Sequence, residues 1–321
     1  MKIETQIQPE LSVTRAEPRI AVLLPCRDEE VAIGDTVAAF RAALPQAEIH
    51  VYDNASTDRT SDVARAAGAI VSREPRPGKG NVMRRMFADI DADIYVLADG
   101  DLTYDATAAQ GMIDLLRRDR LDMVVGVRRH VDDAAYRRGH KFGNRLLTGM
   151  VQRFFGRHFE DMLSGYRVFS RRFVKTFPAM SAGFEIETEL TVHALQMRLP
   201  ADEVPTDYAP RPENSTSKLS TYRDALRIVR TIGLLAKEEK PFAFFGLAAL
   251  LLALPSAAMF ASVLTEFLRT GLVDRFPTLI VSVGGGVIAM LCLVCAVILD
   301  SVARGRREAR HAVYLQHRAV E

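Results

Sequence analysis

The chain alternates short apolar runs with longer segments in which apolar residues recur every three or four positions. Short apolar runs closed by polar residues are typical of strands buried on both faces, and the longer repeat is typical of amphipathic helices. Strands that alternate with helices predict βαβ units, and therefore an α/β domain with a mostly parallel sheet and helices on both faces. The expected strands are Ile20–Pro25, Glu48–Asp53, Ala69–Ser72, Ile94–Ala98 and Asp122–Val127, and the expected helices are Val31–Leu44, Thr57–Ala67, Gly78–Ile90 and Ala106–Arg118.

The pattern becomes less regular after this point. We expect a helix at Tyr136–Phe155, a short strand at Tyr166–Ser170, a helix at Glu185–Arg198 and a strand at Asp202–Tyr208, followed by a polar loop. Together these elements predict one domain over residues 20–220, preceded by a polar tail at 1–19. The tail lacks the apolar core of a signal peptide, so we expect the domain to stay in the cytosol.

The segment Thr221–Lys240 has the pattern of a basic amphipathic helix. Its apolar positions Leu226, Val229, Ile232 and Leu235 fall at helical spacing, and basic residues occupy much of the remainder. Such a helix suits a membrane surface, although a solvated helix of the domain has the same pattern. The basic residues are Arg223, Arg227, Arg230, Lys237 and Lys240.

Two uncharged segments, Phe242–Thr265 and Phe276–Leu299, follow. Each exceeds the roughly 20 apolar residues that cross a hydrocarbon core, so we predict a two-helix transmembrane hairpin at 241–300. Basic residues flank the hairpin on both sides, which places both ends and the basic tail 301–321 in the cytoplasm. We expect a multi-pass protein of the inner (plasma) membrane; the alternative is two core helices of a soluble domain.

Composition adds little to this picture. The three cysteines, Cys26, Cys292 and Cys295, form no disulfide framework, which fits a reducing compartment. The formal net charge of +2 gives no indication of a nucleic-acid partner, and we expect none.

Candidate chemistry lies at Asp99-Gly100-Asp101, where the apolar run Ile94–Ala98 ends. In open α/β sheets, ligands bind off the carboxyl ends of such strands. Two close carboxylates repel each other unless a cation lies between them, and hard oxygen donors suit Mg²⁺ or Mn²⁺ with water and substrate phosphates. The alternative is a polar strand-to-helix turn in which Asp105 caps the next helix.

Three other expected strand and helix ends are polar. Leu24–Glu30 follows the first strand, and Asp53, at the end of the second, could accept hydrogen bonds from a base or ribose. Gly78–Asn81 opens a helix with two glycines and Lys79, which suits a nearby phosphate. This segment does not match the phosphate loop of ordinary ATPases. Taken alone, each of these segments could equally be a helix cap.

In this order and spacing, Leu24–Glu30, Asp53–Asp58, Gly78–Asn81 and Ala98–Asp101 resemble the motifs of glycosyltransferase family 2, whose members have the GT-A fold. Downstream, Glu160–Arg167 resembles the acceptor-side motif of the polyprenyl-phosphate branch, which includes dolichol-phosphate mannosyltransferases and bacterial polyprenyl-phosphate glucosyltransferases. Phe184–Glu189 and Ser217–Leu219 fit the same branch.

The sequence departs from the family pattern at three points. Asp28 and Glu29 stand in a segment where Asn-Glu-Glu is commoner, and Gly100 replaces a frequent alanine. The Gln-x-x-Arg-Trp signature of processive synthases cannot occur, because the chain contains no tryptophan.

The resemblance implies roles for individual residues. Asp99 and Asp101 would bind the metal, and Asp161, Asp101 and Arg167 would act at the reaction centre, although Asp161 also fits a cap. Glu185 and Glu187 would orient the acceptor-binding arginines or solvate a helix start. The implied nucleotide-sugar ligands are Pro25, Asp28, Glu30, Asp53, Lys79, Asp99 and Lys218, and the implied acceptor-phosphate ligands are Arg137, Arg138 and Lys141.

The implied activity is an inverting, metal-dependent transfer of a hexose from a nucleotide-diphosphate sugar to a membrane polyprenyl phosphate, for cell-envelope glycan biosynthesis. UDP-sugars such as UDP-glucose are favoured over GDP-mannose. Relatives with two-span anchors imply a homotetramer. The alternatives are a family 2 transferase with a saccharide or glycolipid acceptor, a nucleotidyltransferase and a non-catalytic membrane scaffold.

Overall fold

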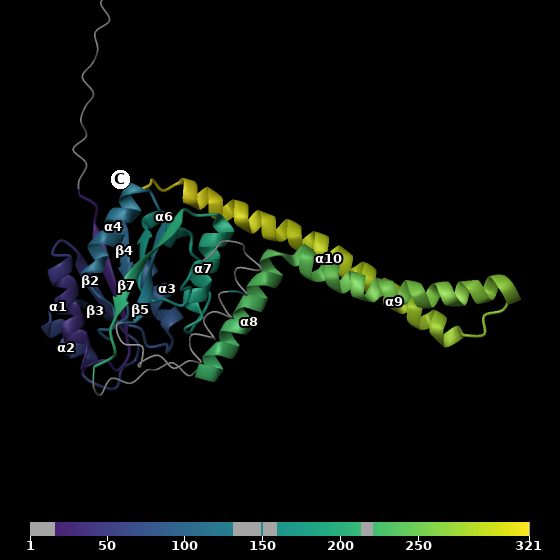
Figure 1. The fold of residues 1–321 in the computed structure, drawn as a ribbon, viewed down its shortest axis with the longest axis horizontal. Coiled ribbons are helices and arrows are strands. Elements are labelled where there is room, and N and C mark those ends of the chain that lie inside the picture. The colour runs from purple at the N-terminus through teal and green to yellow at the C-terminus, as the bar shows by residue number, and fades with distance from the viewer. Residues whose placement is uncertain (1–16, 131–148, 150–158, 213–220, 321) are drawn as a thin grey trace, which may run out of the picture.

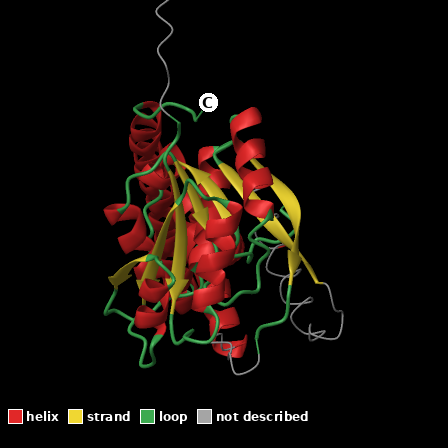
Figure 2. Cartoon of the chain, turned by 90° about the vertical axis from the view of Figure 1, so that its left-hand side faces the viewer, coloured by secondary structure: helices red, strands yellow, loops and turns green. Residues whose placement is uncertain are grey.

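A seven-stranded mixed sheet forms the centre of the first two thirds of the chain (Figures 1 and 2). The structure, a computed structural model, describes residues 17–130, 149, 159–212 and 221–320. The strand order is β3-β2-β1-β4-β6-β5-β7, and β6 alone among these strands runs antiparallel to its neighbours. The strands are β1 (Ile20–Cys26), β2 (Glu48–Asp53), β3 (Ile70–Arg73), β4 (Ile94–Leu97), β5 (Met123–His130), β6 (Arg167–Ser170) and β7 (Ala201–Tyr208).

Helices cover both faces of this sheet, which confirms the predicted α/β class. Alternate residues of β1 point to opposite faces, so Leu23 packs in the core beneath α3 and α7 whereas Val22 and Leu24 pack beneath α1 and α4. The helices of the domain are α1 (Ile33–Ala43), α2 (Thr60–Ala66), α3 (Lys79–Asp89), α4 (Ala108–Arg118), α6 (Arg171–Thr176) and α7 (Ile186–Met197).

The second half of the domain differs from the prediction in two places. Helix α6 was not predicted, because six residues are too few to show a helical repeat; the Ser170 side chain caps its start by accepting from the Phe173 amide at 3.2 Å. Strand β5 continues past the expected end at Val127 to His130, because it pairs with β7 along its whole length. The expected helix Tyr136–Phe155 lies almost entirely outside the described residues.

Helix α8 (Thr221–Glu239) forms where the amphipathic pattern predicted it, and part of its apolar surface contacts the domain. Ile228 and Ile232 are buried against Met162 and Val192. Val229 and Leu234 are 38% and 45% exposed, so the expected position of this helix at a membrane surface stays a prediction. Its exposed side carries Arg230 and Lys237.

Helices α9 (Pro241–Thr270) and α10 (Phe276–Leu315) form a hairpin that points away from the domain (Figure 1). Both are long and apolar enough to cross a membrane, and most of their large apolar side chains are exposed. Small buried residues recur every seven positions, the spacing of a helix–helix seam. A Cβ on Gly285 would lie 2.2 Å from Ser256 Oγ, so the helices approach closely there. The buried positions are Ala249, Ser256, Val263, Ser282, Ala289, Ala296 and Ala303.

Helix α10 does not end with its apolar segment. It continues through most of the expected basic tail and returns to the domain beside α6 (Figure 1). Tyr314 packs against the core on the α3 and α7 face, and Val320 packs against the opposite core. The C-terminal segment is therefore part of the domain's packing rather than a separate tail.

Candidate active site

Four acidic or polar segments converge at the carboxyl edge of the sheet. Three of these segments follow β1, β2 and β4, and the fourth is the start of α3. Ligands of open α/β sheets bind at this edge. Strained backbone is concentrated here: Asp28, Ala55 and Leu102 have φ values of 50°, 55° and 59°, one in each of the three loops. Non-glycine residues rarely adopt this conformation, and it commonly accompanies functional sites.

A buried lysine joins the metal candidate Asp99 to helix α7. Lys79 Nζ forms an ion pair with Asp99 Oδ1 and lies 2.7 Å from Glu187 Oε1. Burial alone would lower the pKa of Lys79, but the two carboxylates outweigh it and raise this pKa. Glu187 therefore pairs with Lys79, a partner that we did not predict for it.

Gly165, from the predicted acceptor-side motif, lies directly against this pair. A Cβ at this position would be 2.8 Å from Asp99 Oδ2 and 3.1 Å from Lys79 Nζ. The glycine amide also donates to Tyr104 Oη at 2.9 Å. The predicted acceptor-side motif therefore lies directly against Asp99 of the predicted metal site.

The second metal candidate, Asp101, is almost completely buried. Thr103 Oγ1 donates to its Oδ1 at 2.6 Å, and Arg211 Nη2 lies 2.5 Å from its Oδ2. Arg211 Nη1 also lies 3.1 Å from Glu29 Oε1. Burial raises the pKa of Asp101, Asp99 adds to this increase, and Arg211 opposes it.

Sequence reasoning missed both Glu29 and Arg211. It assigned the neighbouring Asp28 and Glu30, because no local signal distinguishes three consecutive acidic residues. Arg211 lies 182 positions from Glu29 in a polar loop without periodicity, so sequence offered no sign of this contact.

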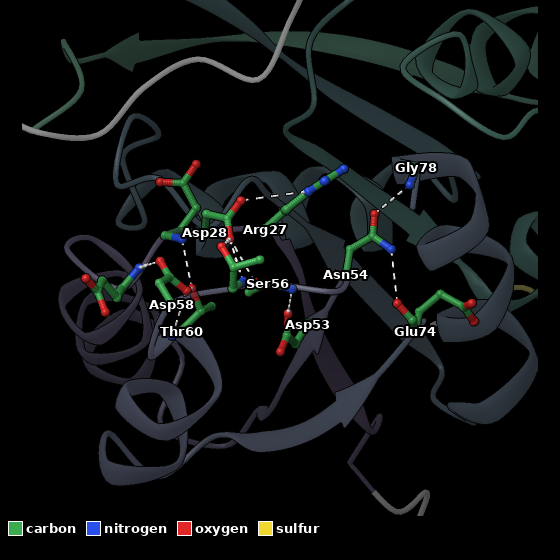
Figure 3. A network of polar contacts seen from close by, with 12 residues as sticks. Arg27, Asp28, Asp53, Asn54, Ser56, Asp58, Thr60, Glu74 and Gly78 are labelled. Carbon is green, nitrogen blue, oxygen red and sulfur yellow. Dashed lines mark hydrogen bonds and ion pairs between the residues drawn. The ribbon is translucent and has the colours of Figure 1, made fainter. Parts of the chain in front are cut away.

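Asp28 and Glu30 instead bind the loop after β2, as Figure 3 shows for Asp28. Asp28 Oδ1 accepts from the Thr57 amide at 2.7 Å, and Glu30 Oε2 accepts from the Arg59 amide at 2.9 Å. Asp28 Oδ2 also lies 3.8 Å from Arg27 Nε, and the hydrogen bonds given for the two carboxylates are those of loop caps.

Asp53 and Asn54 fix the end of β2 (Figure 3). Asp53 accepts from the Ser56 amide at 2.8 Å and from Ser61 Oγ at 2.6 Å. Burial would raise the pKa of Asp53, but hydrogen bonds from these serines outweigh it and lower this pKa. Asn54 Oδ1 accepts from the Gly78 amide at 2.7 Å and so connects β2 to the start of α3.

Asp161 is paired with an arginine that we did not predict. Arg128 Nε and Nη2 lie 2.7 Å and 2.8 Å from the two carboxylate oxygens, a bidentate arrangement. The guanidinium also lies 5.6 Å from the Tyr208 ring centroid. Arg128 was missed because the strand that carries it was expected to end one residue earlier.

Arg167, which was expected to act at the reaction centre, is completely buried. Its guanidinium donates to the carbonyl oxygens of Ser164, Met162 and Glu187 at 2.9, 2.6 and 3.2 Å, and to Thr191 Oγ1 at 3.0 Å. Burial lowers its pKa to about 10, which still leaves it charged at neutral pH. These contacts hold the Asp161–Gly165 loop in place, so we do not retain Arg167 as a catalytic candidate.

The remaining predicted residues are less informative. Pro25 is half-buried near the end of β1, and Glu185 Oε1 accepts from the Gly183 amide at 3.0 Å, which is a local turn contact. Lys218, Arg137, Arg138 and Lys141 lie outside the described residues, and their roles stay predictions.

The donor set fits a divalent cation that is shared with a substrate. Within the described part of the chain, no group of three or more His, Cys, Asp or Glu side chains could enclose a metal. Asp99 and Asp101 offer carboxylate oxygens, and Mg²⁺ is commonly held by one or two carboxylates together with water and substrate phosphates. The alternative interpretation of this segment is a turn capped by Asp105. Asp105 does accept from the Thr107 amide at 2.9 Å, so this cap is present together with the acidic pair Asp99 and Asp101.

Comparisons with known proteins agree with this architecture. The model of the glycosyl transferase family 2 matches residues 21–177. Protein RfbJ of Shigella flexneri is 52% identical over 123 residues, which cover 38% of this chain and 95% of RfbJ. Glycosyltransferase AglJ of Haloferax volcanii is 35% identical over 229 residues, which cover 71% of this chain and 75% of AglJ.

A solved structure shares the fold at lower identity. Glucosyl-3-phosphoglycerate synthase from Mycobacterium tuberculosis, in complex with Mn²⁺, UDP-glucose and phosphoglyceric acid, superposes with a TM-score of 0.56. The match covers 68% of this chain and 80% of that chain at 21–22% identity in several complexes of the same enzyme. The chain belongs to glycosyl transferase family 2 and has a GT-A-like fold.

Proposed function

We propose that this protein transfers a hexose from a nucleotide-diphosphate sugar to the phosphate of a membrane polyprenyl phosphate. UDP-sugars are the favoured donors and Mg²⁺ or Mn²⁺ the favoured metals, since a solved family-fold neighbour was crystallised with Mn²⁺ and UDP-glucose. The observation that carries the proposal is that Gly165 brings the acceptor-side loop against Asp99 at the acidic strand ends.

The donor side has more negative than positive groups. Lys79 is shared by Asp99 and Glu187, and Arg211 is shared by Asp101 and Glu29. A bound divalent cation would be held by Asp99 and Asp101 and would stabilise the charge of the departing diphosphate. Lys79 holds Asp99 in place through their ion pair, and Asp53 and Asn54 order the neighbouring loops for the nucleotide.

The acceptor side supplies a positioned cation rather than a strong base. A phosphate monoester is already largely ionised near neutral pH, so it needs orientation more than deprotonation. Arg128 is a candidate to bind this phosphate, because an arginine fork matches phosphate oxygens. Asp161 would orient Arg128 through its bidentate contact, and a single in-line displacement would invert the sugar's anomeric centre.

The α9–α10 hairpin supports a location at a membrane. Leu251, Leu254 and Met290 are more than 60% exposed, and burying such surface in lipid is favourable. We propose that the hairpin crosses the inner membrane twice and that both its ends are cytoplasmic, since basic residues flank it. The homotetramer also stays a prediction.

Transfer by the full chain in lipid nanodiscs tests the proposal. Radiolabelled UDP-glucose, UDP-galactose and GDP-mannose would each be offered with polyprenyl phosphate and Mn²⁺. We expect one donor to yield a lipid-linked sugar that mild acid releases. Transfer to a saccharide or glycolipid alone would favour the alternative acceptor, and failure to bind any of these donors would favour a scaffold.

A further inference from the structure

We propose that Arg211 is an exchangeable counter-cation of the metal site. It pairs with Asp101 and Glu29, and a divalent cation that binds Asp101 displaces it from this carboxylate. This inference rests on the proposed function, because it concerns the same metal site.

Both oxygens of the Asp101 carboxylate are engaged. Thr103 holds Oδ1 through its hydroxyl at 2.6 Å, and its amide lies 3.3 Å from the same oxygen. Arg211 Nη2 holds Oδ2 at 2.5 Å. Thr103 is two residues from Asp101 in the same turn, so its contacts with Oδ1 are local, whereas Arg211 reaches Oδ2 from a distant segment. We therefore place the cation at Oδ2, where it would replace Arg211.

The two basic side chains of the site, Lys79 and Arg211, differ in how firmly they are held. Lys79 begins helix α3, its side chain is 8% exposed, and it lies between Asp99 and Glu187. Arg211 lies beyond the end of β7, outside any helix or strand, and its side chain is 27% exposed. Arg211 is therefore the more exposed of the two and lies in a segment without helix or strand structure, which makes it the one more easily displaced from its carboxylate.

Arg211 also compensates the charge of two buried carboxylates. Glu29 and Asp101 are 7% and 2% exposed, and the guanidinium lies between them. A buried carboxylate without a nearby cation is costly, so the arginine stabilises the site until a metal replaces it. Once displaced, the guanidinium would remain available to a substrate diphosphate, whose oxygens suit an arginine fork.

Binding of Mn²⁺ to the full chain in detergent, without nucleotide, tests this exchange. Free Mn²⁺ would be measured by electron paramagnetic resonance for the wild type and for Arg211→Gln. We expect Arg211→Gln to bind Mn²⁺ about fivefold or more tightly, the coupling expected when a competing cation is removed. Arg211→Lys, which keeps the charge without the fork, should fall between the two. Unchanged or weaker binding by Arg211→Gln would overturn the exchange.

The matched control is Arg85→Gln, which removes an arginine from an exposed ion pair with Asp89. It should bind Mn²⁺ as the wild type does. An equal increase in Mn²⁺ affinity in this variant would show that net charge explains the effect, and would overturn the proposal. Thermal melting confirms that each variant is folded. If neither the wild type nor Arg211→Gln binds Mn²⁺ with or without a UDP-sugar, the metal site itself fails, a result distinct from binding that Arg211 does not influence.

Discussion

Tyr314 Oη donates a hydrogen bond of 2.9 Å to Asp122 Oδ2, although 192 positions separate the two residues. Asp122 directly precedes β5 and is completely buried, and it also accepts from Ser170 Oγ at 2.6 Å. The Arg172 guanidinium pairs with Asp122 and lies 4.8 Å from the Tyr314 ring centroid. The end of α10 is thus attached at the amino-terminal end of β5, on the side of the sheet opposite the candidate active site.

This contact gives the domain two connections to the hairpin. The first is α8, which leads directly into α9, and the second is the C-terminal part of α10. Arg306 lies 3.8 Å from Glu238, and Arg310 lies 3.8 Å from Glu239, so the two connections also contact each other. Two attachments restrict how far the active-site edge can tilt relative to the hairpin.

The first prediction concerns Tyr314. Tyr314→Phe removes the hydrogen bond to a buried carboxylate and should lower the free energy of unfolding by about 1 kcal/mol. Tyr314→Ala also removes the ring from the core and from Arg172, and should cost about 3 kcal/mol. Denaturant unfolding of the full chain in detergent measures both. The neighbouring Leu315→Ala, at a residue that is 73% exposed, is the control. Equal stability of Tyr314→Ala and the wild type would contradict the second attachment.

The second prediction concerns acid sensitivity. His193 is buried in α7, and burial, together with Arg310, lowers its pKa to about 3. Because the unfolded histidine binds a proton near pH 6.5 and the folded one does not, stability is lost as the pH falls from about 6.5 towards 3. At pH 5 this loss is about 2 kcal/mol.

Urea unfolding at pH 7 and pH 5 measures this loss. His193→Gln cannot titrate and should show a smaller difference between the two pH values than the wild type. His311→Gln, at an exposed position of α10, should retain the wild-type difference. The interpretation is wrong if His193→Gln keeps the full acid sensitivity.

The third prediction concerns Gly165. An alanine Cβ there would meet Asp99 Oδ2 at 2.8 Å and push this carboxylate from Lys79. We expect Gly165→Ala to lower kcat by about tenfold or more, because small displacements of catalytic groups are costly. Gly111→Ala is the matched control, since apart from its chain neighbours and its own helix backbone no described atom lies within 4 Å of its Cβ position. It should keep full activity and gain about 0.5–1 kcal/mol of stability as a helical alanine. Unchanged kcat in Gly165→Ala would show that the position of this loop does not matter for the reaction.

The sequence predicted the site best where the signal was local. The strand ends at Asp53 and Asp99 follow apolar runs, and both lie where a parallel sheet presents ligands. The helical repeat of α8 was also evident, but periodicity shows only that a helix has an apolar face. It does not show whether Ile228 and Ile232 contact a lipid or, as observed, the domain.

Long-range contacts could not be predicted in this way. Arg211 reaches Asp101 because β7 pairs with β5 at the sheet edge, a register that one sequence does not reveal. Arg167 has the charge of a phosphate ligand, but its burial beneath α7 assigns the guanidinium to carbonyl oxygens. The attachment of Tyr314 depends on the length of α10 beyond its apolar segment, which composition alone described as a basic tail.

The fourth prediction tests the central claim, that Asp101 serves a divalent cation in sugar transfer. Mn²⁺-dependent transfer from the accepted nucleotide sugar to polyprenyl phosphate would be compared for the wild type, Asp101→Asn and Asp105→Asn in the same nanodiscs. Asp101→Asn keeps the size of the side chain and removes its charge, and should lower kcat by about a hundredfold or more. Asp105→Asn changes a nearby cap and should retain most activity. Equal transfer by Asp101→Asn and the wild type at every Mn²⁺ concentration would contradict the account.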